Sequence, residues 1–358
     1  MGHSGFGGVN LLFEWFPPYS FHIPLFIFGA GYFYDDTVRV LTHIKKRFRR
    51  LVVSHYLWNV FYATLFLVLT STGLLIWRYS VNLETFFVEP WVDDAQYAFT
   101  AAAWFALSLF LIQVAHTLIR RPLKKVRVIN SEYRLLMIFL GLGLLSTYLA
   151  SLGAYSNLWY LNLGRTLFGL PFLQLGYLYK VKLERFDKTS LLSVGILFIV
   201  QLAFILTIGT PTFSMLYMDF GGRIVEPFLT SFTGIWLCLQ ISSVLAAHFS
   251  PIKLLRYIGD NSWTIMFNQL FGFWILNSMF FLLNVKGFDE VAYKTNIYFE
   301  YIIGGHYQSS ILYLLAGISV SLILGYAAFR MRNRLILWGR VLLKRARHWI
   351  RGEPTEGQ

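Results

Sequence analysis

The chain has 358 residues and a formal net charge of +13, and 56% of its residues are hydrophobic while only 14% are charged. About a quarter of the residues of a soluble domain are charged. The composition therefore excludes an ordinary soluble enzyme and predicts an all-α, polytopic integral membrane protein. The single cysteine, Cys238, excludes a disulfide framework and a cysteine-based metal site.

Nine apolar segments are predicted to be helices of one membrane domain, and most are long enough to cross a bilayer. They occupy 21–34, 53–77, 97–118, 133–153, 161–180, 190–208, 226–248, 260–284 and 311–330. We expect the transmembrane domain to cover residues 1–334. A basic amphipathic tail, 335–358, is expected to lie along anionic lipid headgroups.

Lys and Arg are concentrated in alternate connections between these segments and in the C-terminal tail. The positive-inside rule therefore places those connections and the C-terminus in the cytoplasm, and residues 1–20 outside. The expected location is the cytoplasmic (inner) membrane of a bacterium. Because the positive charge borders the membrane, we expect membrane lipids as partners and no nucleic acid.

The first apolar segment, Phe21–Tyr34, is a candidate site. As a helix it would span roughly 21 Å, which is short of a bilayer core of about 30 Å. It holds His22 and the glycines Gly29 and Gly31. An ionisable side chain at membrane depth usually faces a cavity or a partner. The alternative is an interfacial histidine that donates to a carbonyl freed by Pro24.

Three further groups lie before and after this segment. His3 belongs to a GHSG sequence that could equally be a disordered terminus, and Glu14 is either a partner carboxylate for His22 or part of a solvated loop. The run Lys45–Arg50, KKRFRR, is either a cytoplasmic anchor or a binding site for the phosphates of a cytoplasmic donor.

The stretch 256–277 combines a predicted loop with amides inside an apolar helix. Gly259–Ser262 is expected to form a loop that ends in a helix N-cap. Asn268, Gln269 and Asn277 follow inside the membrane, where amides either join neighbouring helices or line a path. The sequence contains no nucleotide-binding loop or hydrolase motif. The apolar segments carry carboxylates only at their ends, Asp260 and Glu226, and none at membrane depth, which disfavours an ion-coupled transporter.

Five segments resemble, in family order, motifs of the membrane acyltransferase 3 family, in particular its branch that O-acetylates sugars and polysaccharides (fucose 4-O-acetylase-like). FHIPLFIFGAGYFY is similar to the family's HMPLFFFxSGY segment, and KKRFRRLVVSHYLW to its basic loop followed by RLxxPYxxW. AAWFALSLFLIQV resembles LWFLPALFL, TLFGLPFLQLGYLYK resembles PFFLLGYLYK, and IGDNSWTIMFNQLFGFWILN resembles IGxNSxxIMxxHLxxFxxIN.

The resemblance also implies that a helix is missing at the front. The family has ten helices, and its first carries an Arg and then a His followed by a GHS-like exit. Gly2-His3-Ser4 falls at that exit, so Met1 would be an internal methionine or the gene truncated. Ala30, His55 and Asn268-Gln269 depart from a serine, a proline and a histidine of the family motifs, which puts activity in doubt if those side chains do chemistry.

The activity implied by the resemblance is transfer of an acyl group, acetyl above all, from acyl-CoA to a hydroxyl of a sugar or of a lipid-linked or cell-surface polysaccharide. Acetyl-CoA is then a co-substrate, and neither a bound cofactor nor a metal is expected. A histidine suits general base catalysis near neutral pH. The implied catalytic residues are His3 as base and His22 as second candidate or orienting group.

The resemblance assigns the remaining candidates to substrate binding. Arg47 and Arg50 would hold the CoA phosphates. The acceptor path would be lined by Glu14, Gly29, Gly31, Asn261, Ser262, Asn268 and Gln269. Two alternatives stay open: an exporter or flippase for a polysaccharide or lipid-linked sugar, and an inactive, truncated family member.

Overall fold

A computed structural model describes residues 17–77, 80–92, 97–187, 190–209, 212–248, 253–302 and 306–351. Every named element in these ranges is a helix, and the described residues contain no strand beyond an isolated bridge between Ser214 and Asp219. The predicted all-α fold is therefore confirmed.

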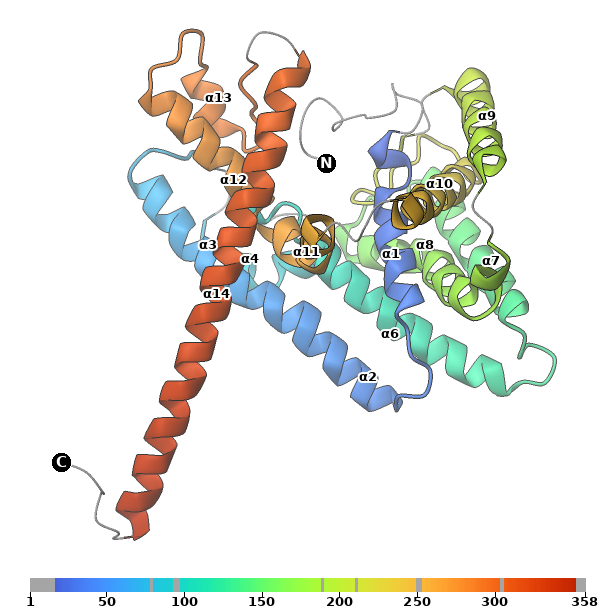
Figure 1. Ribbon diagram of the computed structural model, residues 1–358, viewed down its shortest axis with the longest axis horizontal. Helices are drawn as coiled ribbons and strands as arrows, with labels where there is room; N and C mark the ends of the chain where they lie inside the picture. The colour runs from blue at the N-terminus through green and yellow to red at the C-terminus, as the bar shows by residue number, and fades with distance from the viewer. Residues whose placement is uncertain are drawn as a thin grey trace.

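The helices form two lobes, which stand side by side in Figure 1. The first lobe contains α1 (His22–Tyr32), α5 (Glu89–Val92), α6 (Trp104–Lys125), α7 (Glu132–Ser151), α8 (Leu158–Leu178), α9 (Leu191–Ile208) and α10 (Glu226–His248). The second contains α3 (Ser54–Ser71), α4 (Leu83–Phe87), α12 (Ser262–Leu282), α13 (Glu290–Thr295) and α14 (His306–Arg351). Between them lie α2 (Val40–Arg47) and α11 (Lys253–Asp260).

A long helix links the two lobes. The basic stretch expected as a connection is helical: α2 continues through the π-helix η2 (Phe48–Val53) into α3, which gives 32 residues of uninterrupted helix, Val40–Ser71. Such a helix is about 48 Å long, whereas a bilayer core measures about 30 Å. Its basic first turns therefore extend beyond a hydrocarbon core, and there α2 and η2 pack against α6.

Aromatic side chains fill both cores. In the first lobe Phe168 and Phe172 of α8 pack against Phe228 of α10. The second core contains Tyr62 of α3 and Phe273 of α12. A smaller cluster joins the lobes, built from Ala103, Ala106 and Phe267 with Trp58, Trp263 and Met266 against them.

The helices α1 and α8 approach each other through two glycines. A Cβ built on Gly31 would overlap the backbone carbonyl of Leu173, and a Cβ on Gly176 would overlap the carbonyl of Phe28. Small residues allow such backbone contact between membrane helices. Gly29, in contrast, has open space at its Cβ position. Of the two glycines in α1, only Gly31 therefore lies at the close approach to α8.

Within the described residues, six helices are long and apolar enough to cross a membrane: Val40–Ser71, Glu132–Ser151, Leu191–Ile208, Glu226–Ala247, Ser262–Leu282 and Ile311–Leu335. The prediction of a multi-pass membrane protein is confirmed. Three predicted spans differ from these six. The helix α1 has only 11 residues, and α6 and α8 carry a series of buried polar side chains, Gln113, His116, Arg120, Asn162, Arg165 and Gln174.

The last helix joins the final span to the predicted tail. In Figure 1 α14 runs straight and without interruption from His306 to Arg351. There is thus no break in the helix near residue 335, where the tail was expected to begin. Whether the basic end lies along lipid headgroups stays a prediction.

Candidate functional site

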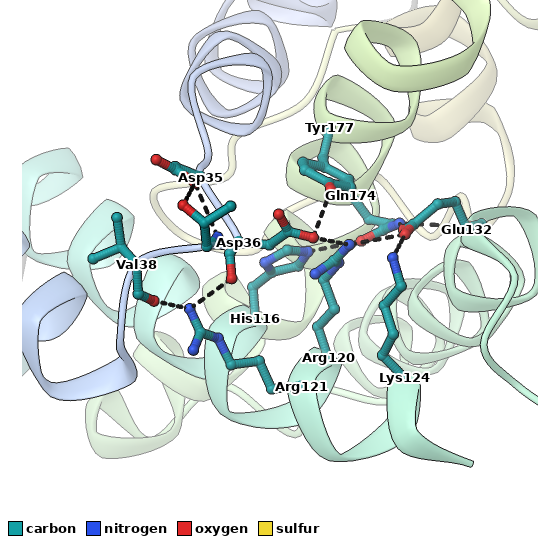
Figure 2. A network of polar contacts seen from close by, with 11 residues as sticks. Asp35, Asp36, Val38, His116, Arg120, Arg121, Lys124, Glu132, Gln174 and Tyr177 are labelled. Atoms are coloured by element: carbon teal, nitrogen blue, oxygen red, sulfur yellow. Dashed lines mark hydrogen bonds and ion pairs between the residues drawn. The ribbon is translucent and has the colours of Figure 1, made fainter. Parts of the chain in front are cut away.

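Buried charges gather where the ends of α1, α6 and α8 meet the start of α7 (Figure 2). Arg120 is 1% exposed and Glu132 is 7% exposed, and Arg120 Nη2 lies 2.9 Å from Glu132 Oε1. Lys124 Nζ also contacts Glu132 Oε1. Gln174 Nε2 donates to Glu132 Oε2 at 2.9 Å. Two cations and an amide therefore compensate one buried carboxylate, as burial of charge requires.

The α1–α2 loop closes this cluster from a second side. Tyr177 Oη donates to Asp36 Oδ2 at 2.7 Å, and Arg120 Nη2 lies 3.4 Å from the same oxygen. Arg121 donates to the carbonyl oxygens of Asp36, at 3.2 Å, and of Val38. We call Asp36, His116, Arg120, Lys124, Glu132, Gln174 and Tyr177 the Glu132 network.

Helical spacing explains why these side chains meet. His116, Arg120 and Lys124 recur every four residues, which places them on one face of α6. Gln174 and Tyr177 are three residues apart on α8 and share the facing side. Glu132 is the first residue of α7, where the helix dipole favours a negative charge.

The network fixes the tautomer of His116. The Gln174 amide nitrogen faces two acceptors, Glu132 Oε2 at 2.9 Å and the Glu132 carbonyl at 3.4 Å. Its oxygen must therefore face His116 Nε2, which lies 2.9 Å away. Because that oxygen only accepts, Nε2 carries the proton, and Nδ1 of the neutral ring is an acceptor. Nδ1 is buried and has no partner among the described residues.

Two more buried polar groups surround His116. The ring of Tyr34 lies 5.1 Å from the ring of His116 and 5.1 Å from that of His43, edge to face in both cases. Tyr34 Oη and His43 Nε2 are also buried without a partner in the described part of the chain. The Arg120 guanidinium lies 5.6 Å from the Tyr34 ring centre. We call Tyr34, His43 and His116 the Tyr34 cluster.

The predicted phosphate-binding residues lie beside this cluster. Arg47 follows His43 by one turn of α2 and is half-buried, and its Nε has no partner within the described residues. Arg50 follows in η2 and is exposed. The structure therefore brings Arg47 next to a group of buried polar atoms that the sequence did not reveal.

More basic residues converge on the α1–α2 loop. Thr37 donates two hydrogen bonds to Asp35, and these lower the pKa of that exposed carboxyl. The charges of Lys180 and Lys46 lower it further. Lys180 belongs to the π-helix η4 (Tyr179–Leu183) that follows α8. The basic ends of α2 and α8 thus lie near the same loop.

His22 is the first residue of α1, and the Tyr34 cluster lies beyond the other end of this helix. The 11 residues of α1 span about 16 Å. Its Nδ1 donates to the Pro18 carbonyl at 2.6 Å, so Nε2 is the acceptor of the neutral ring. The carbonyl that Pro24 leaves without a helical donor is that of Ser20, which accepts instead from Thr230 and Ser231 at 3.4 and 3.2 Å. His22 therefore donates to a carbonyl, but not to the one that Pro24 frees.

A second buried cation occupies the other half of α8. Arg165 is 1% exposed, and its Nε donates to the Leu216 carbonyl at 3.0 Å. Its guanidinium lies 4.9 Å from the Trp104 ring centre, and Nη1 lies 3.3 Å from Asn162 Oδ1. These contacts tie α8 to α6 and to the loop before α10, which is a structural role.

The amide of Asn268 joins α12 to α3. Asn268 is fully buried, its Oδ1 accepts from Tyr62 Oη of α3 at 2.6 Å, and its Nδ2 donates to the Thr264 carbonyl at 2.7 Å. Gln269 makes only a long contact, 3.5 Å, to the Met266 carbonyl. Both polar atoms of the Asn268 amide are therefore engaged in contacts between and within helices.

In place of the predicted loop 259–262, the structure has a single residue between two helices. The helix α11 ends at Asp260 and α12 begins at Ser262, so Asn261 alone separates them. Its side chain does not cap α12 but donates backwards to the Tyr257 carbonyl at 2.9 Å. The loop prediction was wrong because Gly259 and Asp260 belong to α11. The neighbouring Trp263 donates to Ser54 Oγ at 3.2 Å, which joins the start of α12 to the start of α3.

The predicted residues His3 and Glu14 lie outside the described residues, as does the segment on which the missing-helix prediction depends. Sequence reasoning missed His43, His116, Gln174 and Tyr177 as site residues. The available signal was His116 inside the apolar segment 97–118, with Arg120 four residues later just past its end. Their partners come from distant parts of the chain, which no local pattern indicates.

Among protein families, the sequence model described as an acyltransferase domain, that of the acyltransferase 3 family, matches residues 1–340. Comparisons with curated proteins and with solved structures gave no match. The family match covers both lobes and includes the Glu132 network and the Tyr34 cluster.

Proposed function

Because the chain belongs to the acyltransferase 3 family, we propose that it transfers an acyl group, acetyl above all, from acyl-CoA to a hydroxyl of a sugar or of a lipid-linked or cell-surface polysaccharide. The match over residues 1–340 is the observation that carries the reaction class. The acetyl-CoA donor, the sugar O-acetylating branch and the bacterial inner membrane rest on the motif resemblance of the sequence.

The reaction needs a base for the acceptor hydroxyl. The hydroxyl oxygen attacks the thioester carbonyl while its proton passes to the base, and the CoA thiolate then leaves and takes up a proton. We assign the base to His3, with His22 as second candidate. The hydrogen bond from His22 Nδ1 to the Pro18 carbonyl supports His22 as a candidate, since it leaves Nε2 as the basic nitrogen.

The donor is proposed to bind at the basic end of the first lobe. Four basic residues come together there: Lys46 and Arg47 of α2, Arg50 of η2 and Lys180 of η4. The family's donor carries phosphates, which guanidinium groups bind in a bidentate way. This end then faces the cytoplasm, together with the C-terminus, as the positive-inside rule requires. The acceptor is proposed to pass Ser262 and Gln269.

The test uses purified full-length protein in lipid nanodiscs with labelled acetyl-CoA and a sugar acceptor. Arg47→Ala and Arg50→Ala are expected to raise the KM for acetyl-CoA, whereas Arg49→Ala, which removes an exposed charge from the same run, should not.

His3→Ala is expected to lower kcat by about 10²–10⁴-fold. If both His3→Ala and His22→Ala transfer the label as fast as the wild-type protein, the site assignment is refuted. If the sugar crosses the membrane of protein-containing vesicles with no acyl donor present, the protein is instead an exporter.

A further inference from the structure

The Tyr34 cluster presents three buried polar atoms that nothing in the described part of the chain satisfies: Tyr34 Oη, His43 Nε2 and His116 Nδ1. Buried polar groups in folded proteins nearly always have a partner, because an unpaired one loses its hydration without compensation. The Tyr34 ring contacts the rings of both histidines, and the unpaired atoms of these neighbouring side chains call for a partner that is bound from outside the chain.

We propose that the Tyr34 cluster binds an amide of the pantetheine arm of the acyl-CoA donor, a proposal that rests on the proposed function. The tautomer fixed by Gln174 makes His116 Nδ1 an acceptor, and the Tyr34 hydroxyl is able to donate. An amide offers an N–H to His116 Nδ1 and a carbonyl to the Tyr34 hydroxyl, and so satisfies two of the three unpaired atoms. A phosphate or carboxylate oxygen would instead face the lone pair of Nδ1.

The position of the cluster agrees with the order of groups along CoA. Arg47 lies one turn after His43 on α2, and its half-buried guanidinium faces the same side. A donor whose phosphates contact Arg47 and Arg50 would direct its amide-bearing arm along this face toward Tyr34. A metal ion does not fit, because no group of three His, Cys, Asp or Glu side chains suited to metal binding exists within the described residues.

Tyr34→Phe tests the proposal because it removes only the hydroxyl. Two probes are compared by calorimetry on the full-length protein in nanodiscs: CoA, and 3′-phospho-ADP, which has the phosphates but no pantetheine arm. We expect Tyr34→Phe to weaken CoA binding about 2–10-fold, the loss of one hydrogen bond, and to leave 3′-phospho-ADP binding unchanged. The melting temperature of the unliganded protein should not fall, since an unpaired hydroxyl is removed.

His116→Gln is the second variant. A glutamine amide reaches the position of Nε2 and can still donate to Gln174, but it provides no acceptor at the position of Nδ1. The same selective loss of CoA affinity is expected. Tyr313→Phe is the matched control: Tyr313 is a fully buried tyrosine of the second lobe whose hydroxyl contacts Asn277, so CoA binding should stay unchanged while stability falls.

The outcomes separate this inference from the proposed function. If the wild-type protein binds neither CoA nor 3′-phospho-ADP, the donor assignment itself fails. If it binds CoA and both variants bind it equally well, the pantetheine site is refuted and the proposed function stands. A lowered melting temperature of unliganded Tyr34→Phe with unchanged CoA affinity would show that the hydroxyl contacts only a structural water.

Discussion

The side-chain oxygen of Gln174 accepts a hydrogen bond from His116 Nε2 at 2.9 Å while its nitrogen donates to Glu132. A single neutral amide thus connects a buried carboxylate to a buried imidazole and fixes the orientation of both. An Asn or a shorter side chain would not reach both groups. The network therefore depends on both the amide and the length of the side chain at residue 174.

Gln174→Glu should destabilise the protein in a pH-dependent way. At pH 8 the new carboxylate lies beside Glu132, and two adjacent carboxylates repel unless one takes up a proton. As the pH falls, one carboxyl becomes protonated and can donate to the other, so the loss of melting temperature relative to wild type should shrink toward pH 5. Thermal unfolding of the detergent-solubilised protein measures this.

Gln174→Leu is the control for that measurement. It leaves Glu132 Oε2 and His116 Nε2 without the hydrogen bonds that Gln174 makes to them, at a cost of roughly 1–3 kcal/mol for each unpaired atom. That cost contains no new titrating group and should stay constant between pH 5 and pH 8. If Gln174→Glu loses the same melting temperature relative to wild type at pH 5 and at pH 8, the new carboxyl is not close to Glu132.

Asp36 should stabilise the fold except in acid. Burial raises the pKa of Asp36, but the hydrogen bond from Tyr177 and the charges of Arg120 and Lys124 outweigh burial and hold the pKa below its usual value. Its contribution to stability is therefore fully present above the unfolded-state pKa of about 3.9 and is lost as the pH falls through the lower folded-state pKa.

Asp36→Asn is expected to lower the melting temperature between pH 5 and pH 8, and the difference from wild type should close below about pH 4. Glu290→Gln, which removes an exposed partner 3.9 Å from Lys294, should change little at any pH. A deficit of Asp36→Asn that persists unchanged to pH 3 would mean that the carboxylate form of Asp36 is not the stabilising species.

The sequence was sufficient for the class of fold and for the individual apolar helices, because both follow from composition and from the length of apolar runs. It was not sufficient for the pairing of polar residues. Asp36 meets Tyr177, and Glu132 meets Gln174, only after α1, α7 and α8 have packed. That an intramembrane histidine needs a partner is predictable, whereas the identity of the partner is a property of the tertiary structure.

The two glycines of α1 illustrate the same limit. Gly29 and Gly31 look equivalent in the sequence, yet Gly31 contacts the backbone of Leu173 and Gly29 does not face a neighbour. Gly31→Ala should therefore separate α1 from α8 and destabilise the protein by about 1–3 kcal/mol, the usual cost of overpacking.

Gly29→Ala is the matched control, because it makes the same chemical change in open space two residues away. It is expected to be neutral or to stabilise α1 by roughly 0.5–1 kcal/mol, since alanine is the better helix former. Thermal unfolding and protease resistance in detergent report on both variants. Comparable behaviour of the two would mean that α1 and α8 do not cross at Gly31.

Tyr62 and Asn268 should couple energetically as a pair that joins α3 to α12. Their hydrogen bond, 2.6 Å from Tyr62 Oη to Asn268 Oδ1, is buried, and such bonds between membrane helices contribute about 0.6 kcal/mol on average. A double-mutant cycle with Tyr62→Phe and Asn268→Leu, followed by thermal unfolding, measures that coupling directly.

The same variants distinguish a helix contact from a substrate contact at Asn268. If Asn268 only joins helices, Tyr62→Phe and Asn268→Leu lower stability, and the remaining folded protein keeps the wild-type KM for the sugar acceptor. If Asn268 also lines the acceptor path, Asn268→Leu raises that KM, whereas Tyr62→Phe, which leaves the amide in place, does not. Since both polar atoms of Asn268 already have partners within the protein, we expect the first result.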